Sequence, residues 1–227
     1  MGEYDFPALY REVRERFGGR VAGLDDTAAR TPVGACPGWD VRAVLSHVTG
    51  VVADIQDGRL EGAGSDEWTT AQVAGRRDRS LAEIVAEWDA RAPALEEQLG
   101  AWPPDLAGQI VSDVTTHELD VRGALGDTGA RDTECVRYAF ERYAGRLGTR
   151  IAEAGLPALR LVTDGDDVVA GAGEPAATVR APRYELARAM AGRRSVAQVR
   201  AYAWEGDPEP YLAVFSGYGH RVDDLAE

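Results

Sequence analysis

Two histidines and one aspartate have the types and spacing of a metal site. His47 lies in a predicted helix over residues 41–55, whose apolar side chains recur every three or four positions. Asp113 and His117 lie four residues apart in another predicted helix, over residues 105–125, and this spacing puts both on one helical face. Helical bundles build metal sites from such inward-facing side chains. Two nitrogens and one oxygen suit zinc with an open fourth position, where water or a substrate can bind.

Simpler interpretations of the same residues remain open at this stage. Asp113 and His117 also fit an ion pair on a helix surface, because that spacing is common there. His47 alone fits a core or boundary histidine with satisfied hydrogen bonds. The spacing of residues along each helix does not show that the two helices meet.

The segment Cys-Pro-Gly-Trp-Asp at residues 36–40 favours a tight turn before a helix. In this interpretation Trp39 packs against the helix and Asp40 caps its first turn. A nucleophilic Cys36 is the alternative, since a helix N-terminus lowers the pKa of a thiol. No histidine lies near Cys36 in the sequence, so we expect a structural role. Cys135 lies near the start of a later predicted helix and has the same structural expectation.

The first two thirds of the chain are predicted to be helical. Ser80 and Glu83 form a capping-box pattern at the start of a third long helix, and Pro93 within that helix should kink or split it. Residues 58–79 are polar and aperiodic, which predicts a long loop. The predicted long helices cover residues 6–21, 41–55, 80–99, 105–125 and 133–154.

After residue 155 the pattern changes from a helical period to short strand-like runs. We therefore predict an α+β protein with two domains, a metal-binding helical bundle over residues 1–155 and a small α+β domain over residues 156–227. The second domain is predicted to hold strands at 159–163, 168–170, 177–181 and 199–204, and a short helix at 184–191.

The composition excludes several classes of protein. The formal net charge is −13 and all 25 basic residues are arginine, so the chain should repel nucleic-acid backbones. No run approaches 18 apolar residues, and the acidic N-terminus lacks the pattern of a signal peptide. Two cysteines are too few for a disulfide scaffold. These features predict a cytoplasmic protein that binds neither nucleic acid nor membrane, as a monomer or homodimer.

Three segments resemble a known family. Residues 37–42 (Pro-Gly-Trp-Asp-Val-Arg), with His47 after them, are similar to the second-helix signature of the mycothiol-dependent maleylpyruvate isomerase family, part of the wider DinB-like metal-binding bundles. Asp113 and residues 117–122 resemble its fourth-helix segment. Residues 181–195 resemble its C-terminal sterol-carrier-like module.

The resemblance implies a DinB-like four-helix bundle with a divalent metal, zinc above all, in which His47, Asp113 and His117 match the ligand positions. One departure is Asp113, where the isomerase type has the longer glutamate. The implied function is a metal-dependent, mycothiol-dependent isomerase acting on a small electrophilic acid. The alternatives are a mycothiol S-transferase, with the same site but no elimination step, and a non-catalytic metal- or ligand-binding bundle.

Arg193 is the candidate catalytic residue for binding a substrate carboxylate. It follows Gly192 after the short helix at 184–191, and a bidentate arginine–carboxylate contact fixes orientation as well as affinity. From there, we expect its guanidinium to reach toward the metal of the bundle. Arg194 and Arg221 remain alternatives for this role. The alternative to a functional role is that Arg193 simply belongs to a solvated basic loop.

Overall fold

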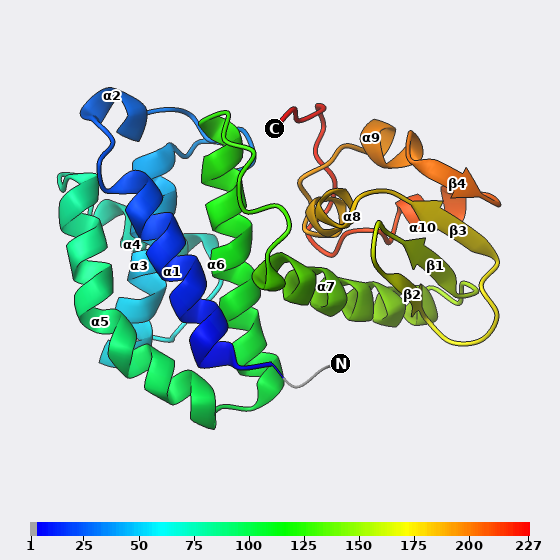
Figure 1. Cartoon of the computed structure of the whole chain (residues 1–227), viewed down its shortest axis with the longest axis horizontal. Coiled ribbons are helices and arrows are strands. Elements are labelled where there is room, and N and C mark those ends of the chain that lie inside the picture. The colour runs from blue at the N-terminus through cyan, green and yellow to red at the C-terminus, as the bar shows by residue number, and fades with distance from the viewer. Residues whose placement is uncertain (1–3) are drawn as a thin grey trace. The chain divides into compact units, whose positions relative to one another are not determined.

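The computed structural model describes residues 4–227 and divides them into two compact units. The N-terminal unit ends at Gly129 and the C-terminal unit covers Ala130–Ala226. The chain has an N-terminal helical region followed by a small sheet with further helices, so the predicted α+β class is confirmed (Figure 1). The units divide at residue 129 rather than near 155, because the helix over Glu134–Glu153 (α7) packs on elements that follow it in the chain.

Four long helices form the bundle of the N-terminal unit. They are α1 (Phe6–Val21), α3 (Val41–Asp57), α5 (Leu81–Ala101) and α6 (Pro104–Ala124). Helix α1 packs on α5 and α6, and α3 packs on the same two helices, so the four close into a ring. This arrangement makes α3 and α6, which carry the predicted metal ligands, direct neighbours.

The bundle core is built on the apolar stripe of α1. The ring of Phe17 lies edge-on to the ring of Trp88 from α5, with 5.7 Å between centroids. The Trp88 indole nitrogen donates a hydrogen bond of 2.7 Å to the Tyr10 hydroxyl. All three side chains are buried. The paired hydroxyl and indole satisfy the polar atoms that these large aromatic residues bring into the core.

The prediction of a loop over residues 58–79 is wrong in its second half. A helix, α4 (Asp66–Ala74), forms there and packs on α3. Ser65 caps its first turn by accepting a hydrogen bond from the Trp68 amide. The helix has no apolar stripe, and its buried residue is the polar Gln72, so hydrophobic periodicity could not reveal it.

Helix α5 begins at the predicted capping box, in which Ser80 and Glu83 satisfy each other's backbone amides. Pro93 lies inside this helix, which continues over Leu81–Ala101 as one element. The expected split at Pro93 therefore does not occur.

The segment before α3 is a closed loop that carries Cys36 and Trp39. Pro32 and Asp40 pair as an antiparallel bridge after the short helix α2 (Asp26–Ala29). Inside the bridge the Trp39 amide donates to the Cys36 carbonyl at 3.0 Å. Asp40 caps α3 by accepting a hydrogen bond of 2.8 Å from the Ala43 amide, as predicted. The loop is thus fixed to the start of the helix that carries His47.

The C-terminal unit holds a four-stranded sheet in the order β2-β1-β3-β4. Strands β1 and β3 are parallel, and the two outer pairs are antiparallel. The predicted strand at 199–204 is wrong: most of it is divided between a short helix, α9, and strand β4, because the Ser195–Gln198 capping box starts a helical turn just before it. The elements of this unit are α7 (Glu134–Glu153), β1 (Leu159–Val162), β2 (Asp167–Ala170), β3 (Ala177–Arg180), α8 (Arg183–Met190), α9 (Val196–Arg200), β4 (Ala203–Glu205) and α10 (Glu209–Leu212).

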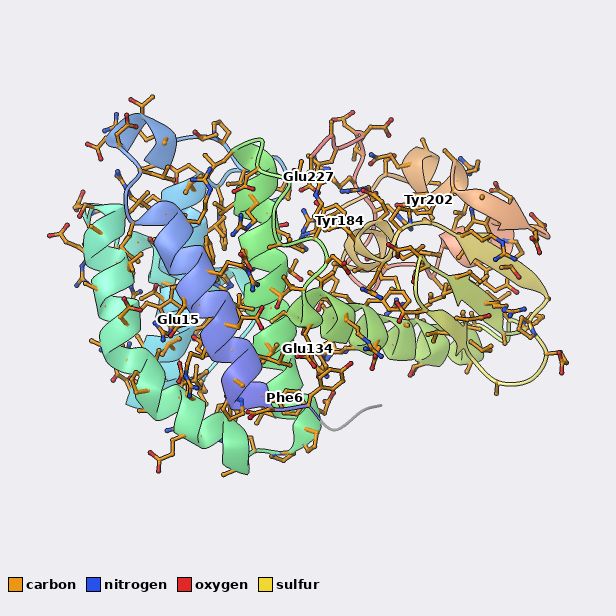
Figure 2. The ribbon with its side chains drawn as sticks, in the orientation of Figure 1. Phe6, Glu15, Glu134, Tyr184, Tyr202 and Glu227 are labelled. Carbon is orange, nitrogen blue, oxygen red and sulfur yellow. The ribbon has the colours of Figure 1, made fainter. Side chains whose placement is uncertain are left out.

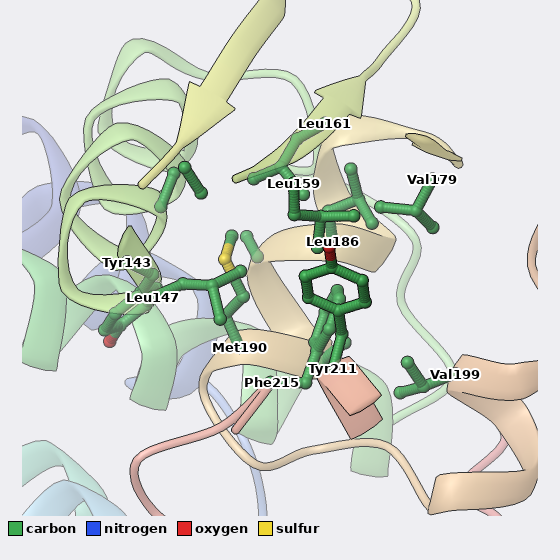
Figure 3. Packing of buried hydrophobic residues seen from close by; sticks show 14 of the residues in the cluster. Tyr143, Leu147, Leu159, Leu161, Val179, Leu186, Met190, Val199, Tyr211 and Phe215 are labelled. Atoms are coloured by element: carbon green, nitrogen blue, oxygen red, sulfur yellow. The ribbon is translucent and has the colours of Figure 1, made fainter. Parts of the chain in front are cut away.

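One face of this sheet packs on α7 and α8. Leu159 and Leu161 of β1 point into a cluster with Leu147 of α7 and Leu186 of α8 (Figure 3). Phe215, which follows α10, lies in the same cluster. The C-terminal unit therefore has a hydrophobic core of its own. Among the helices of residues 4–227, none combines the length and hydropathy that crossing a membrane requires.

Candidate metal centre

The three predicted ligands come together inside the N-terminal unit. Nitrogen atoms of His47 and His117 and a carboxylate oxygen of Asp113 all lie within 4.8 Å of one another. The Nε2 atom of His47 is 3.9 Å from Asp113 Oδ2, and the Nε2 atom of His117 is 3.8 Å from Asp113 Oδ1. The His117 side chain is only 10% exposed, whereas Asp113 is 34% exposed. The pair on α6 is therefore not a surface ion pair, and it faces His47 on α3.

The other ring nitrogen of His47 is held by α4. Gln72 Oε1 lies 2.7 Å from His47 Nδ1, and Gln72 Nε2 donates to Asp54 Oδ2 at 2.7 Å. The amide nitrogen of Gln72 is thus used on the carboxylate, so its oxygen must accept a hydrogen bond from Nδ1. The proton of neutral His47 therefore lies on Nδ1, and Nε2 has its lone pair toward Asp113.

Gly50 allows this contact between α3 and α4. A Cβ atom at Gly50 would lie 2.5 Å from Gln72 Cβ and 2.6 Å from Gln72 Cγ, closer than real Cβ contacts. The absence of a side chain at Gly50 therefore lets α4 approach α3 closely enough for Gln72 to reach His47, one turn earlier on the same helix.

The other ring nitrogen of His117 is held by a carboxylate of its own helix. Asp120 Oδ2 lies 3.1 Å from His117 Nδ1, and the Asp120 side chain is fully buried. Because an ionised carboxylate only accepts hydrogen bonds, Nδ1 carries a proton. Nε2 is then the nitrogen that is deprotonated in the neutral ring. A histidine ligand held by a carboxylate in this way is common around protein-bound zinc.

The thiol of Cys36 shares this carboxylate. Its Sγ donates to Asp120 Oδ2 at 3.2 Å and lies 3.9 Å from His117 Nδ1. The structure thus places a histidine next to Cys36, although none is near it in the sequence. Cys36, His117 and Asp120 form a second group whose ligand atoms are close enough for a metal. Since the three are already hydrogen-bonded to one another through Asp120 Oδ2, they fit an outer support for His117.

Aromatic rings surround the two histidines. The His47 and His117 rings are 5.0 Å apart between centroids and nearly perpendicular. The Trp39 ring lies 5.3 Å from that of His47 and 6.4 Å from that of His117. Trp68 of α4 meets His47 edge-on at 6.4 Å. The indole rings limit the directions in which the histidines can turn.

The two histidines have opposite pKa shifts. Burial and the nearby His117 ring lower the pKa of His47, and they outweigh the Asp113 carboxylate and the hydrogen bond with Gln72. Burial also lowers the pKa of His117, but hydrogen bonds with Asp120 and Cys36 and the charge of Asp113 outweigh burial and raise that pKa to about 10. At neutral pH the metal-free protein therefore has a neutral His47 and a protonated His117.

These observations fit a divalent metal. The two Nε2 atoms and the Asp113 carboxylate face one another, and hydrogen bonds at both Nδ1 atoms leave Nε2 as the ligand nitrogen. Two imidazoles and one carboxylate form a donor set that suits zinc and leaves a coordination position for another molecule.

The sequence did not identify Gln72, Asp120 or Cys36 as parts of this site. The sequence does contain one signal for Asp120. It lies three residues after His117, and in a helix this spacing puts the two side chains next to each other. Gln72 had none, since its helix was predicted to be a loop. Cys36 is separated from Asp120 by 84 residues, a contact that local pattern does not reveal.

Arg193 lies in the C-terminal unit, in the turn that ends α8. Gly192 adopts a left-handed φ of 78°, and the Arg193 amide donates to the Arg188 carbonyl at 2.9 Å. This is the glycine-terminated helix end that the sequence predicted. The Arg193 guanidinium donates to the Ala191 carbonyl at 2.8 Å, which holds it beside its own turn.

The neighbouring Arg194 has a clear structural role. Its guanidinium makes two hydrogen bonds with the Glu185 carboxylate, at 2.7 and 2.9 Å. The Tyr202 hydroxyl donates to the same carboxylate at 3.3 Å, and the Arg194 guanidinium lies 5.8 Å from the Tyr184 ring centroid. Both tyrosines belong to the C-terminal unit (Figure 2). Arg194 is buried in this cluster, and its charge is paired there with Glu185.

Comparison with known proteins gives one family and one fold. Residues 10–128 match the mycothiol maleylpyruvate isomerase N-terminal domain. The chain is similar to a crystal structure of the mycothiol-dependent maleylpyruvate isomerase, with 14% identity, 83% of this chain and 88% of that chain covered, and a TM-score of 0.59. For a histidine-to-alanine mutant of that enzyme the identity is 13%, the coverage 88% and 91%, and the TM-score 0.61. These two similarities show the fold. No curated protein matches the sequence. Because the domain match covers more than half of its length, the chain belongs to the mycothiol maleylpyruvate isomerase N-terminal domain family.

Proposed function

We propose that this protein is a metal-dependent enzyme that uses mycothiol to isomerise a small electrophilic acid. The observation that carries the proposal is the convergence of His47, Asp113 and His117, with both Nδ1 atoms held by other side chains. The choice of mycothiol as the thiol rests on the family, because the matched domain is the N-terminal domain of mycothiol maleylpyruvate isomerase. The reaction, the metal and the substrate are proposed on these grounds.

His47, Asp113 and His117 would hold the metal, with zinc as the ion that the donor set suits best. A bound divalent metal supplies positive charge that stabilises a thiolate at neutral pH. Gln72 and Asp120 keep the two imidazoles oriented, with Nε2 toward Asp113. As a metal ligand His117 would have to give up its Nε2 proton, because its Nδ1 proton would stay in the hydrogen bond to Asp120.

The substrate proposed is an acid with an electrophilic alkene. Reversible addition of a thiolate to one alkene carbon turns the double bond into a single bond, which can rotate before the thiolate leaves again. This sequence isomerises the alkene and returns the thiol unchanged. The carboxylate of such a substrate needs a cation, and arginine is the permanent cation that a chain without lysine can offer. Arg193 is proposed for this contact.

The function can be tested with purified protein in two steps. Elemental analysis measures the bound metal, and mass spectrometry then follows mycothiol with maleylpyruvate and with a panel of other electrophilic acids. Isomerised product with unconsumed thiol supports the proposal. Accumulation of an S-conjugate would instead identify a mycothiol S-transferase. Bound metal with no thiol reaction on any electrophile would identify a non-catalytic binding bundle.

The Arg193 assignment can be tested separately. Arg193→Ala should raise KM or lower kcat for an acidic electrophile by about 10- to 1000-fold, equivalent to about 1.4–4 kcal/mol, without changing metal content. Arg200→Ala, at an exposed arginine paired with Glu209 in the same unit, is the matched control and should have no such effect. Equal losses with acidic and neutral electrophiles would exclude Arg193 as the carboxylate contact.

A further inference from the structure

A chain of hydrogen bonds runs from the surface of the N-terminal unit to the His47 ring, through Arg59, Asp54 and Gln72. The Arg59 guanidinium contacts Asp54 Oδ1 through Nε at 2.9 Å and through a second nitrogen at 2.8 Å. The other carboxylate oxygen of Asp54 accepts from Gln72. Asp54 and Gln72 are buried, whereas the Arg59 side chain is 58% exposed. Asp54 therefore connects an ion pair at the surface with a proposed metal ligand two turns earlier in the same helix.

The end of α3 places Arg59 on this carboxylate. Gly58 adopts a left-handed φ of 71°, and the Arg59 amide donates to the Asp54 carbonyl at 2.8 Å. A hydrogen bond from a residue to the one five positions before it is typical of a glycine-terminated helix end. The chain thus turns back over the last turn of α3, and this turn brings the Arg59 guanidinium to the Asp54 side chain.

The direction of the hydrogen bonds in this chain is set from its Arg59 end. An arginine only donates and an ionised carboxylate only accepts. Asp54 Oδ2 therefore takes the amide nitrogen of Gln72, and the amide oxygen is left for His47 Nδ1. A side-chain amide fits the same space after a half-turn, and a neutral imidazole can either donate or accept at Nδ1. Gln72 and His47 by themselves would allow both directions, so the carboxylate selects one.

Helix α4 is held by contacts that do not use the Gln72 side chain. The Trp68 indole nitrogen donates to the Arg59 carbonyl at 3.0 Å. The Arg76 guanidinium makes two hydrogen bonds with the Glu87 carboxylate of α5, at 2.6 and 2.9 Å. It also donates to the backbone carbonyl of Gln72 at 3.2 Å. Because the backbone at Gln72 is fixed in this way, the carboxylate contact of its amide group acts on the orientation of that group.

We propose that Asp54 is a positioning residue for His47. It orients the Gln72 amide, and the amide oxygen then keeps the proton of neutral His47 on Nδ1 and the lone pair on Nε2. A histidine binds a metal through the nitrogen that carries no proton, and the partner of the other nitrogen decides which one that is. The consequence for the metal rests on the proposed function, whereas the position of the proton is a property of the metal-free protein.

The test reverses the chain without changing its shape. In Asp54→Asn, Arg59 still needs an oxygen, so the new amide nitrogen faces Gln72. The Gln72 amide must then turn, accept from that nitrogen and donate to His47 Nδ1. We expect Nδ1 of metal-free His47 to be protonated in wild type and to carry no proton in the variant, measured at neutral pH from the ¹⁵N NMR shifts of the ring. Zinc affinity should fall about 10- to 100-fold, the range for residues that support a ligand.

Asp57→Asn is the matched control. It makes the same substitution three residues later, at a carboxylate that also pairs with Arg59, at 2.6 Å, but is 35% exposed. Its hydrogen bonds go to Arg59 and Arg91 and not to Gln72. The Nδ1 proton of His47 and the zinc affinity should both stay as in wild type.

A double variant, Asp54→Asn with Gln72→Glu, separates orientation from general stabilisation. The carboxylate introduced at position 72 only accepts, from the amide nitrogen at position 54 and from His47 Nδ1. The Nδ1 proton should therefore return, and zinc affinity should rise above that of the single variant. A merely structural role for Asp54 predicts no such recovery, because the double variant changes two buried side chains instead of one.

The outcomes separate this inference from the proposed function. A protonated Nδ1 in Asp54→Asn overturns the inference, as does an Nδ1 without a proton in wild type or in the double variant. The last two measurements decide the matter even where the single variant does not fold. If wild type binds no zinc, the proposed function fails, and the state of Nδ1 in the metal-free proteins still decides whether Asp54 positions His47.

Discussion

The α4 side and the α6 side of the candidate metal centre hold their histidines with different hydrogen-bond acceptors. On the α4 side, the neutral amide oxygen of Gln72 accepts from His47. On the α6 side, the buried carboxylate of Asp120 accepts from His117 and also from the Cys36 thiol. Both contacts direct Nε2 toward Asp113.

The difference between the two sides is electrostatic. An amide fixes the orientation of an imidazole without adding charge, and burial then lowers the pKa of His47. A carboxylate fixes the orientation and also stabilises the imidazolium, so the pKa of His117 rises to about 10. In the proposed metal centre, neutral His47 could therefore bind an ion directly, whereas His117 would first have to lose a proton.

The largest expected effect is the loss of a ligand. Mutation of a residue that only hydrogen-bonds to a metal ligand lowers metal affinity by up to about 100-fold. His117→Ala removes a proposed ligand itself, so its loss of metal affinity should be larger than that. Metal content after dialysis measures this. His220→Ala is the control, because His220 lies in the C-terminal unit with its Nε2 2.6 Å from the Leu212 carbonyl oxygen. Equal metal in wild type and His117→Ala would show that the proposed site is wrong.

Removing the carboxylate on the α6 side should change the pH dependence of metal binding. Because His117 is protonated below about pH 10 in the metal-free protein, zinc affinity should rise about tenfold per pH unit between pH 7 and 9. Asp120→Asn lowers that pKa and should flatten this slope, with a loss of about 10- to 100-fold at pH 9. Gln72→Ala should leave the slope unchanged, since Gln72 is uncharged.

The same pKa has a consequence for the stability of the metal-free protein. A folded-state pKa raised above the unfolded value of about 6.5 stabilises the fold fully below that pH. This contribution decreases as the pH rises toward 10, and urea unfolding of metal-free protein should show the decrease. The Asp120→Asn protein should lack it. An identical pH dependence in both proteins would contradict the assigned role of Asp120.

A smaller effect is expected where α4 meets α3. Gly50→Ala should push Gln72 away, because the new Cβ would lie 2.5 Å from Gln72 Cβ. We expect a loss of about 1–3 kcal/mol in unfolding free energy and of about tenfold in zinc affinity. Gly19→Ala in α1 is the matched control, since nothing lies within 4 Å of its added Cβ. Unchanged zinc affinity in Gly50→Ala would show that the Gln72 contact is dispensable.

The smallest effect is expected for the thiol on the α6 side. Cys36→Ser keeps a donor for Asp120 and should retain most thiol-dependent activity, consistent with the structural role predicted for this residue. Steady-state rates with mycothiol measure it. A thousandfold loss with the fold and the metal content intact would identify Cys36 as a catalytic thiol instead.

Local features of this chain were predictable because their causes lie within a few residues. The apolar stripe of α1, the Asp40 cap of α3 and the Ser80–Glu83 capping box each depend on side chains at most one or two turns apart. The helix α4 was missed for the same reason: its stability comes from packing on α3 and not from a stripe of its own. The prediction of a strand at 199–204 was wrong because the capping box at Ser195 starts a helix there, despite the β-forming residues that follow.

The sequence by itself determined which residues form the helices of the bundle and which side chains on them are able to bind a metal. The i, i+4 pair of Asp113 and His117 follows from helix geometry alone. Only the tertiary structure decided that His47 faces this pair and that Gln72 and Asp120 orient the two rings. It also decided that the Cys36 thiol lies beside Asp120. Apart from the contact between Asp120 and His117, which share a helix, these contacts join residues that are far apart in the chain. Their distances depend on how α3, α4, α6 and the loop before α3 pack together. No local sequence pattern sets that packing.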